Sequence, residues 1–317
     1  MSTEGGMKAV FAALAANMGV AIAKFVAFAL TGSSSMLSEA IHSVADSGNQ
    51  ILLLVGNKRS KRKRDQEHQF GYGRLRYVYA FIVSIVLFLV GGLFSLYEGF
   101  HKIQHPEALS DPTVAFVVLF AAIGLEGFSL RTALKEANKS RGKHGLLRFV
   151  RRTRQPELPV ILLEDIGALI GLTFALFGIS MAVITGDGRW DGLGAAAVGS
   201  LLVVIAIFLA FEMSSMLTGE SALPEDQLAV RRAIEATAGV SRVIHLRTLH
   251  LGPDELLVGT KIGVAPDSSG AEIAAIIDAA EVAIRSVVKM ESVIFVEPDV
   301  FDPERAARDA DPDSAAS

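Results

Sequence analysis

The stretch SEAIHSVADSGNQ, residues 38–50, carries four polar side chains at steps of three, four and three residues. On a helix this spacing places Glu39, His42, Asp46 and Asn49 on one face. An imidazole and a carboxylate one turn apart point to one spot, so a metal ion can bridge His42 and Asp46. The stretch therefore predicts a helix with a polar stripe that can bind a cation.

A second segment, VILLEDIGALIG, carries adjacent Glu164 and Asp165 in an otherwise apolar setting. Adjacent residues point about 100° apart on a helix, so normally only one of them faces a shared site. A charged Asp near the centre of a membrane helix costs roughly 2.5–3.5 kcal/mol and is tolerated where it faces a cavity, pairs or binds an ion. The two segments together predict an intramembrane pathway for a cation or a proton. Hydrogen bonding between packed helices is the alternative for any one such residue.

The composition supports a membrane setting. Of the 317 residues, 51% are hydrophobic, and the mean hydropathy is +0.42 with a net charge of −4. A typical soluble domain is less apolar than this. The sequence has no cysteine, which excludes disulfides and thiolate metal sites, so a metal ion must be held by nitrogen and oxygen ligands.

Six stretches are expected to cross a bilayer, which takes about 20 mainly apolar residues. Five of them are plainly apolar, whereas the stretch with the polar stripe would rank low by hydropathy alone. We include it because the preceding link, TGSSS, is long enough only to reverse the chain. The expected spans are residues 8–31, 35–56, 77–96, 114–134, 159–185 and 193–213.

Two links between these spans are strongly basic: NKRSKRKRD after the second and KEANKSRGKHGLLRFVRRTR after the fourth. By the positive-inside rule both face the cytoplasm, and six spans then put both termini there as well. A nucleic-acid site is the weaker interpretation, because the basic links alternate with spans and lack interleaved aromatic residues. We expect a multi-pass protein of a bacterial cell (inner) membrane, with no nucleic-acid partner.

The remainder of the chain has a different pattern. LPEDQLAVRRAIEATAG and GAEIAAIIDAAEVAIRSVV are amphipathic at helical spacing, whereas SRVIHLRTLHL, ELLVGTKIGVA and ESVIFVEP read as strands. The order predicts a small cytoplasmic α+β domain of ferredoxin-like α-β-β-α-β type. We therefore expect a six-helix transmembrane transport domain over 1–216, the α+β domain over 217–300 and a disordered tail over 301–317.

Four motifs resemble those of the cation diffusion facilitator family, the proton-coupled divalent-metal exporters that include the zinc transporters. They are GSSSMLSEAIHSVADSGNQ, HQFGYGRLR, LLEDIGALIG and TGESALPED, in the family's order and over residues of about 8–298. The wording EAIHSVAD…NQ and LLED is most similar to the branch that contains the ninth human zinc transporter. The resemblance implies a Zn²⁺/H⁺ antiporter that exports metal from the cytoplasm as a homodimer, with no organic cofactor.

The resemblance also implies the transport site. The family uses two ligands on the second span, which fall on His42 and Asp46, and two on the fifth, of which the aspartate falls on Asp165. Such nitrogen and oxygen ligands suit Zn²⁺, and also Mn²⁺, Fe²⁺ or Co²⁺.

The sequence departs from the family at the remaining ligand. That position lies four residues before the aspartate and is Ile161, which cannot bind a metal. Glu164, water or a polar group such as Asn49 is then expected to complete the shell.

An accessory metal site in the family's loop is expected to be weak. It falls on Asp65, His68 and Tyr72, where tyrosine replaces a second histidine. The resemblance further implies a charge pair at the membrane surface between Arg74 and Glu220, for which solvated surface charges are the alternative.

The family's metal cluster in the cytoplasmic domain is expected to be absent. Of the matching positions only the last could bind a metal: Ile244, Lys261, Phe295 and Glu297. His245 and His250 lie nearby, but an odd separation on a strand points them to opposite sides. We interpret both as ordinary sheet residues.

In the resulting mechanism, protons compete with metal for His42, Asp46 and Asp165, because the ligands must be deprotonated to bind the ion. Helix rocking supplies alternating access. One alternative is an intramembrane enzyme using His42 with Asp46 or Asp165 as acid and base, but no serine or cysteine nucleophile motif accompanies them. Another is a non-transporting scaffold, in which Ile161 marks lost activity. We expect no enzymatic activity.

Overall fold

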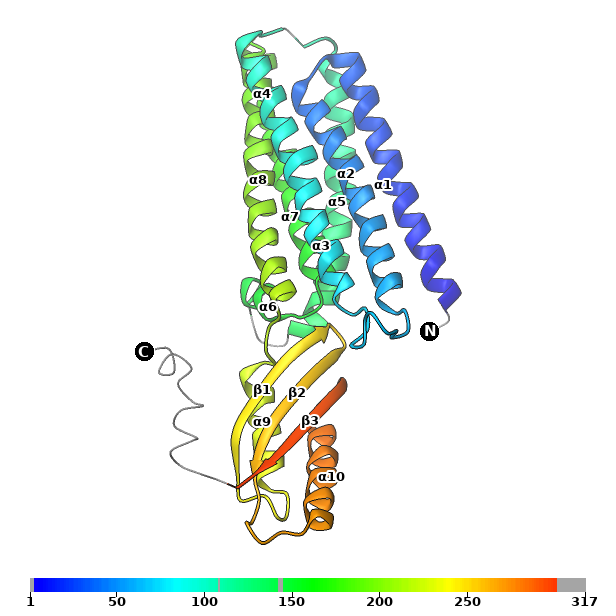
Figure 1. Cartoon of the computed structure of the whole chain (residues 1–317). Coiled ribbons are helices and arrows are strands. Elements are labelled where there is room, and N and C mark those ends of the chain that lie inside the picture. Colours follow the sequence, from blue (N-terminus) through cyan, green and yellow to red (C-terminus); the bar gives the residue numbers. More distant parts are fainter. Residues whose placement is uncertain (1–2, 108, 142–144, 301–317) are drawn as a thin grey trace, which may run out of the picture. The chain divides into compact units, whose positions relative to one another are not determined.

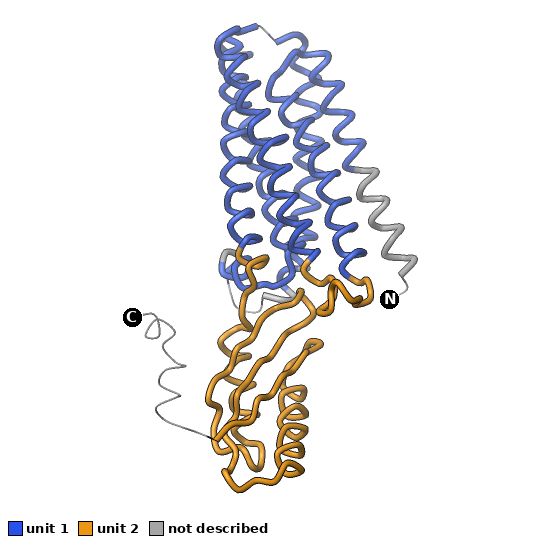
Figure 2. The backbone as a smooth tube through the Cα atoms, in the orientation of Figure 1, with its two compact units in different colours: residues 1–60, 75–214 blue, residues 61–74, 215–317 orange. Residues whose placement is uncertain are grey.

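The structure is a computed structural model that describes residues 3–300 except 108 and 142–144. Side chains are described from residue 17 onward within these ranges, apart from 136, 139–141 and 147. The chain divides into two compact units: Met1–Ser60 with Leu75–Ser214, and Lys61–Arg74 with Ser215–Ser317 (Figure 2). The link Lys61–Arg74 thus belongs to the second unit. The expected tail, 301–317, lies outside the described residues.

The first unit is a bundle of long helices (Figure 1). All six expected spans fall within helical segments, so the polar stretch is helical as predicted. The segments are α1 (Thr3–Thr31), α2 (Ser34–Ser60), α3 (Leu75–Val86), η1 (Leu87–Leu93), α4 (Phe94–Gln104), α5 (Pro112–Arg141), α6 (Leu146–Arg152), α7 (Glu157–Thr185) and α8 (Arg189–Thr218).

Four described segments are long and apolar enough to cross a bilayer: Leu75–Gln104, Pro112–Lys135, Glu157–Thr185 and Arg189–Thr218. Asn17–Thr31 of α1 is a shorter apolar helix in the described part of the chain. α2 does not reach the same hydropathy because polar residues occupy its first half, as the sequence indicated. The third expected span is helical over Leu75–Gln104, but its middle, η1, is a π-helix.

The N-terminus of α2 is fixed by a buried aspartate at the start of α8. Asp191 accepts hydrogen bonds from Ser33 Oγ at 2.7 Å, Ser34 N at 2.7 Å and Ser35 N at 3.2 Å. Its own carbonyl accepts from Ser35 Oγ at 2.8 Å. First-turn N–H groups have no partner within their helix, so this carboxylate satisfies them and sets where α2 begins.

Helices α1, α2, α5 and α7 of this unit form a ring that encloses the polar residues of α2. α1 contacts α2 and α5, and α7 contacts the same two helices. A cavity that opens between these four helices is therefore lined by segments from the first, second, fourth and fifth expected spans.

The second unit contains α9 (Pro224–Glu235), β1 (Arg242–Gly252), β2 (Glu255–Gly263), α10 (Gly270–Val287) and β3 (Glu291–Asp299). The predicted α-β-β-α-β order is confirmed. The sheet order is β1-β2-β3, with β1 and β2 antiparallel and β2 and β3 parallel. The parallel pair requires a crossover, which α10 supplies.

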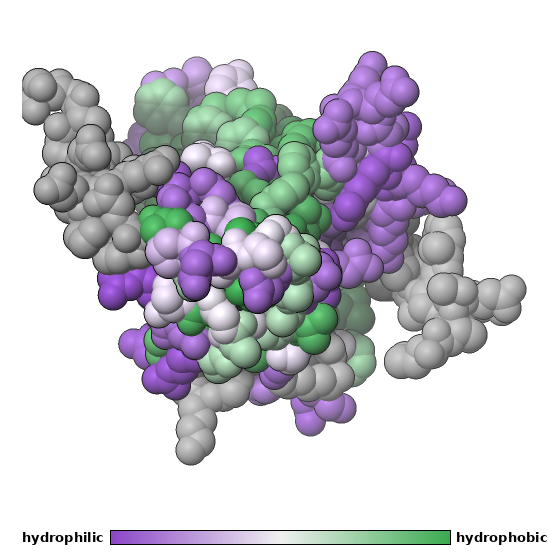
Figure 3. Space-filling model, turned by 60° about the horizontal axis from the view of Figure 1, so that its bottom comes forward, coloured by the Kyte–Doolittle hydropathy of each residue, from purple (hydrophilic) through white to green (hydrophobic). Residues whose placement is uncertain are grey.

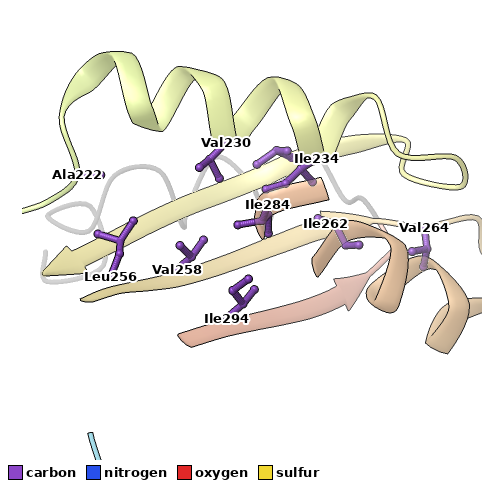
Figure 4. Packing of buried hydrophobic residues seen from close by; sticks show 10 residues of the cluster. Ala222, Val230, Ile234, Leu256, Val258, Ile262, Val264, Ile284 and Ile294 are labelled. Atoms are coloured by element: carbon purple, nitrogen blue, oxygen red, sulfur yellow. The ribbon is translucent and has the colours of Figure 1, made fainter. Parts of the chain in front are cut away.

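The core of the second unit lies between its sheet and its helices. Val230 and Ile234 of α9, Ile284 of α10 and Val258 and Ile262 of β2 are all buried in one cluster (Figure 4). At the end of the molecule that faces the viewer in Figure 3, polar and apolar residues are interspersed rather than gathered in one apolar patch.

The link Lys61–Arg74 packs on the sheet of this unit through one glycine and one charge pair. A Cβ at Gly73 would lie 2.7 Å from the Leu251 carbonyl oxygen, so only glycine fits there. Arg64 forms an ion pair with Glu255. The second glycine of the motif HQFGYGRLR therefore allows close backbone approach to the end of β1.

Candidate metal transport site

His42 and Asp46 of α2 lie one turn apart in the first unit, as the spacing predicted. His42 is 1% exposed, and its Nδ1 lies 3.4 Å from Asp46 Oδ1. Within the described part of the chain, both ring nitrogens of His42 and Oδ1 of Asp46 are buried without a hydrogen-bond partner. Buried polar atoms almost always have a partner, so these atoms have free lone pairs or donors for a bound species.

The adjacent carboxylates of α7 have different partners. Glu164 is buried and accepts a 2.6 Å hydrogen bond from Asn49 Nδ2 of α2. Asp165 accepts a 3.1 Å hydrogen bond from Ser129 Oγ of α5. The angle between adjacent helical residues thus directs one carboxylate toward α2 and the other toward α5.

A small cavity of about 20 Å³ joins these groups, room for about one water molecule by this measure. Both Glu164 and Asp165 line it, although the helical angle favoured only one of them facing a shared site. The cavity is lined by Asn17, Val20, Ser43, Asp46, Gln50, Glu126, Ile161, Glu164 and Asp165.

The ligands predicted from the sequence surround this cavity without forming a closed shell. Asp46, Glu164 and Asp165 line it, whereas His42 does not line the cavity and lies beside Asp46. Asn49 donates a hydrogen bond to Glu164 and does not itself line the cavity. In the part of the chain that the structure describes, no three His, Asp or Glu side chains are already grouped to hold one metal ion. Side-chain rotation toward the cavity is needed for a full shell.

Two charged residues near the site were missed by the sequence analysis. Lys24 of α1 is completely buried, with its Nζ 3.0 Å from Glu39 Oε2 and 2.8 Å from Ser43 Oγ. Glu126 of α5 lines the cavity. The signal was available, because each is an ionisable residue inside an expected span, and such residues face a polar interior.

The loop residues Asp65, His68 and Tyr72 are close together in the second unit, and they bind one another. Tyr72 donates a hydrogen bond from its hydroxyl to Asp65 Oδ2, and the His68 backbone N–H donates to Oδ1 at 2.8 Å. The rings of His68 and Tyr72 stack with centroids 4.3 Å apart. The Tyr72 hydroxyl and the His68 N–H lower the pKa of Asp65, and the same Asp65 contact raises the pKa of Tyr72.

Glu297 of β3 is the one possible metal ligand among the four expected cluster positions, and it forms an ion pair with Lys261. Lys261 Nζ lies 3.0 Å from Glu297 Oε1 and 3.3 Å from Asp299 Oδ2. The hydrogen bond that the Lys261 ammonium donates to Glu297 is the main cause that raises the pKa of Lys261. On β1, His245 pairs with Lys261 and is partly exposed, whereas His250 pairs with Leu256 and is buried.

The implied charge pair stays a prediction. Arg74 and Glu220 are both partly buried in the second unit. A Cβ on Gly219, the neighbour of Glu220, would lie 3.2 Å from Arg74 Nη2, so the two segments are adjacent.

Comparison with known proteins matches both units. The cation efflux transmembrane domain family matches residues 10–218, and the cation efflux protein cytoplasmic domain family matches residues 222–299. The chain belongs to the cation efflux family. Its resemblance to the branch of the ninth human zinc transporter is confirmed, because "Proton-coupled zinc antiporter SLC30A9, mitochondrial" of Homo sapiens is 32% identical over 251 residues.

Other relatives span several kingdoms. The Mus musculus protein of the same name is 33% identical over 251 residues, 78% of this chain and 44% of the relative. "Metal tolerance protein C4" of Arabidopsis thaliana is 27% identical, covering 80% of this chain and 56% of its own. "Cation-efflux pump FieF" of Serratia proteamaculans is 28% identical, with 78% of both chains covered. The chain spans about half the length of the first of these relatives.

As a cation efflux protein, the chain is an integral multi-pass membrane protein whose second unit matches the family's cytoplasmic domain. The transmembrane match includes every residue that lines the cavity. The polar groups inside the four-helix ring therefore lie in the domain that gives the family its name.

Proposed function

We propose that this protein exports a divalent metal ion, Zn²⁺ first among them, in exchange for protons through the cavity between α1, α2, α5 and α7. The observation that carries the proposal is the buried pair His42 and Asp46, whose ring nitrogens and Oδ1 lack a hydrogen-bond partner among the described residues, beside a cavity lined by carboxylates. The SLC30A9 relatives are named as proton-coupled zinc antiporters, which supports both zinc as the transported metal and the coupling to protons.

Binding would use His42 in its neutral form with Asp46, Asp165 and Glu164 ionised. Asn49 orients Glu164 through its 2.6 Å hydrogen bond. Because these ligands bind either protons or metal, loading one releases the other. The outward-facing site takes up protons and releases metal, and the inward-facing site then loses protons and binds metal again.

The donor set is one nitrogen with several carboxylate oxygens. It suits Zn²⁺ and also Mn²⁺, Fe²⁺ and Co²⁺, since cysteine is absent from the chain. A metal-panel uptake assay on the natural protein beside Glu164→Gln identifies the metal. The same assay shows whether Glu164 is one of the ligands.

The proposed topology has six spans, with the basic links and both termini in the cytoplasm of a bacterial cell and two chains paired through the α/β unit. Because the sequence has no cysteine, single-cysteine variants report sidedness directly. A membrane-impermeant thiol reagent on sealed cells should label Glu107→Cys and spare Arg62→Cys, which follow the third and second spans. Labelling of both from one side contradicts the topology.

The transport test uses purified protein in vesicles with a metal dye inside and an imposed pH gradient. Asp46→Ala and Asp165→Ala should abolish dye-reported metal movement, whereas Asp187→Ala, a partly exposed acid in the α7–α8 link, should keep it. If both site variants move every divalent metal at the unsubstituted rate, the site is wrong. Stoichiometric metal binding without transport would instead favour the scaffold interpretation.

A further inference from the structure

Glu126 stands apart within its helix. It is the only charged residue between Pro112 and Leu130 of α5, in a segment apolar enough to cross a membrane. A carboxylate in that position costs roughly 2.5–3.5 kcal/mol on insertion scales, so its side chain must have a polar destination. That destination is the cavity that Asp46, Glu164 and Asp165 also line.

We propose that Glu126 supplies the transported metal ion with the ligand that α7 lacks at Ile161. On α2, His42 and Asp46 form a ligand pair one turn apart. On α7 the residue one turn before Asp165 is Ile161, which has no donor atom. Ile161 and Glu126 line the same cavity, so α5 can fill the position that α7 leaves empty of donors. This inference rests on the proposed transport function.

The orientation of α5 is supported by a second contact. Ser129 lies three residues after Glu126, on the same helical face, and its hydroxyl donates to Asp165 Oδ2 at 3.1 Å. The face of α5 that carries Glu126 is therefore turned toward α7. α5 thus contributes an acceptor to the cavity and holds one of the predicted ligands.

Glu126 also lacks another role in the part of the chain that the structure describes. It forms no ion pair or hydrogen bond there, although it interacts electrostatically with Lys24, Asp46 and His42. The ammonium of Lys24 is held by Glu39 and Ser43 at 3.0 and 2.8 Å. The nearby fixed cation is therefore already engaged by a different carboxylate.

The charge of the cavity favours a divalent cation. Asp46, Glu126, Glu164 and Asp165 bring up to four negative charges to a small volume. Like charges in a poorly hydrated site repel strongly, and an ion coordinated by several of them relieves that repulsion. Glu126 then contributes both a ligand and part of the compensating charge.

The test compares equilibrium Zn²⁺ affinity of the full-length protein in detergent, by dye competition, for four variants. They are Glu126→Gln, Ile161→His, the double variant and Asp46→Asn, beside the exposed control Glu107→Gln. Loss of groups that only support a ligand already weakens metal binding by about 10–100-fold, so Glu126→Gln should weaken it at least about 10-fold. The control should bind normally.

The double variant is the decisive arm, because a histidine one turn before Asp165 reproduces the His–Asp pair of α2. It should recover most of the affinity lost in Glu126→Gln. X-ray absorption of the bound Zn²⁺ should show one imidazole ligand in the natural protein and two in the double variant. Matching elution volumes and melting temperatures establish that the variants are folded.

Normal affinity in folded Glu126→Gln overturns the inference, and so does a double variant that binds no better than Glu126→Gln while Ile161→His alone binds normally. If Glu126→Gln does not fold, Glu126→Asp provides the same comparison, because it keeps the charge and withdraws the oxygens by one methylene. Asp46→Asn separates the two levels. If Asp46→Asn binds Zn²⁺ normally, the proposed function fails. If Asp46→Asn loses binding while Glu126→Gln keeps it, only the role of Glu126 is refuted.

Discussion

Two groups of residues predicted as metal ligands have opposite surroundings. In the first unit, His42 and Asp46 are buried, and within the described residues both histidine nitrogens and one carboxylate oxygen have no hydrogen-bond partner. In the loop of the second unit, both oxygens of Asp65 accept hydrogen bonds, from Tyr72 and from the His68 backbone. The residue types are alike, but among the described residues only the first group has buried polar atoms without a hydrogen-bond partner.

The availability of donor atoms for an ion, rather than residue type, therefore distinguishes a candidate binding site from a structural cluster. A carboxylate whose two oxygens both accept hydrogen bonds, as in Asp65, has fewer lone pairs left for an ion than one with a free oxygen, as in Asp46. The same distinction applies to lysines. Lys261 binds the otherwise exposed Glu297 of β3. Lys24 similarly binds Glu39, but that pair is fully buried and therefore has far more influence on stability.

The largest expected effect tests this contrast directly. Asp46→Asn should reduce metal transport by about 100-fold or more, since loss of a ligand exceeds the 10–100-fold effect of a supporting group. Asp65→Asn should change the rate by less than about two-fold, within the scatter expected when no ligand is lost. Vesicle uptake under a fixed pH gradient measures both. A comparable loss in both variants would break the comparison.

The next effect concerns stability. Lys24→Met leaves Glu39 buried without its partner, and breaking a buried pair costs about 3–5 kcal/mol. A double variant, Lys24→Met with Glu39→Leu, removes both charges and should recover most of that loss. The single tryptophan, Trp190, allows unfolding of the first unit to be followed by fluorescence. Equal stability of the single and double variants would show that the pair is not coupled.

A gain of function would sharpen the comparison from the other side. Tyr72→His should open the loop cluster, because it removes the hydroxyl that occupies Asp65 and adds a nitrogen donor near His68. In an Asp46→Asn background, we expect one additional Zn²⁺ per chain by equilibrium dialysis. Tyr72→Phe is the matched control, since it frees Asp65 without adding a donor and should bind none.

The sequence predicted the elements better than their partners. The polar stripe of α2, the strand and helix order of the second unit, and a helical segment for each expected span all follow from spacing and turn signals. The π-helical η1 had no comparable signal, because local periodicity does not report how a helix packs against α8. A Cβ on Gly92 of η1 would lie 2.7 Å from Val203 Cγ2, which indicates how closely the two helices pack.

Periodicity along one helix predicted that His42 and Asp46 lie together, but not which residues of other helices line the cavity beside Glu164 and Asp165. His42 and Asp46 are four residues apart, so one periodicity places both. Lys24 and Glu126 were missed because the polar groups near each of them lie on other helices. A sequence scored by hydropathy treats each as a tolerated charge. The hydrogen bond from Tyr72 to Asp65 was missed for a related reason. A tyrosine in place of a histidine ligand indicates that a metal site is lost, but it does not indicate that the tyrosine binds the remaining ligand, Asp65.

The smallest effect is expected at the start of α10, where Ser269 and Glu272 satisfy each other's polar groups. Ser269 Oγ accepts from the Glu272 N–H, and the Glu272 carboxylate accepts from the Ser269 N–H at 2.7 Å, a reciprocal cap. Ser269→Ala should cost about 1 kcal/mol, seen as faster hydrogen exchange in the first turn of α10.

The Ser269 N–H, and then its hydroxyl, lower the pKa of Glu272 below its usual 4.5. A lowered carboxyl pKa means that this stabilisation is complete above the unfolded value and is lost as the pH falls through the folded one. Exchange corrected for its intrinsic pH dependence should therefore be constant between pH 7 and pH 5.5 and rise below about pH 4.5. In Ser269→Ala that rise should be smaller, because part of the interaction is already gone. An unchanged pH profile in the variant would mean that the cap does not hold α10, and that satisfied hydrogen bonds alone do not identify a structural cluster.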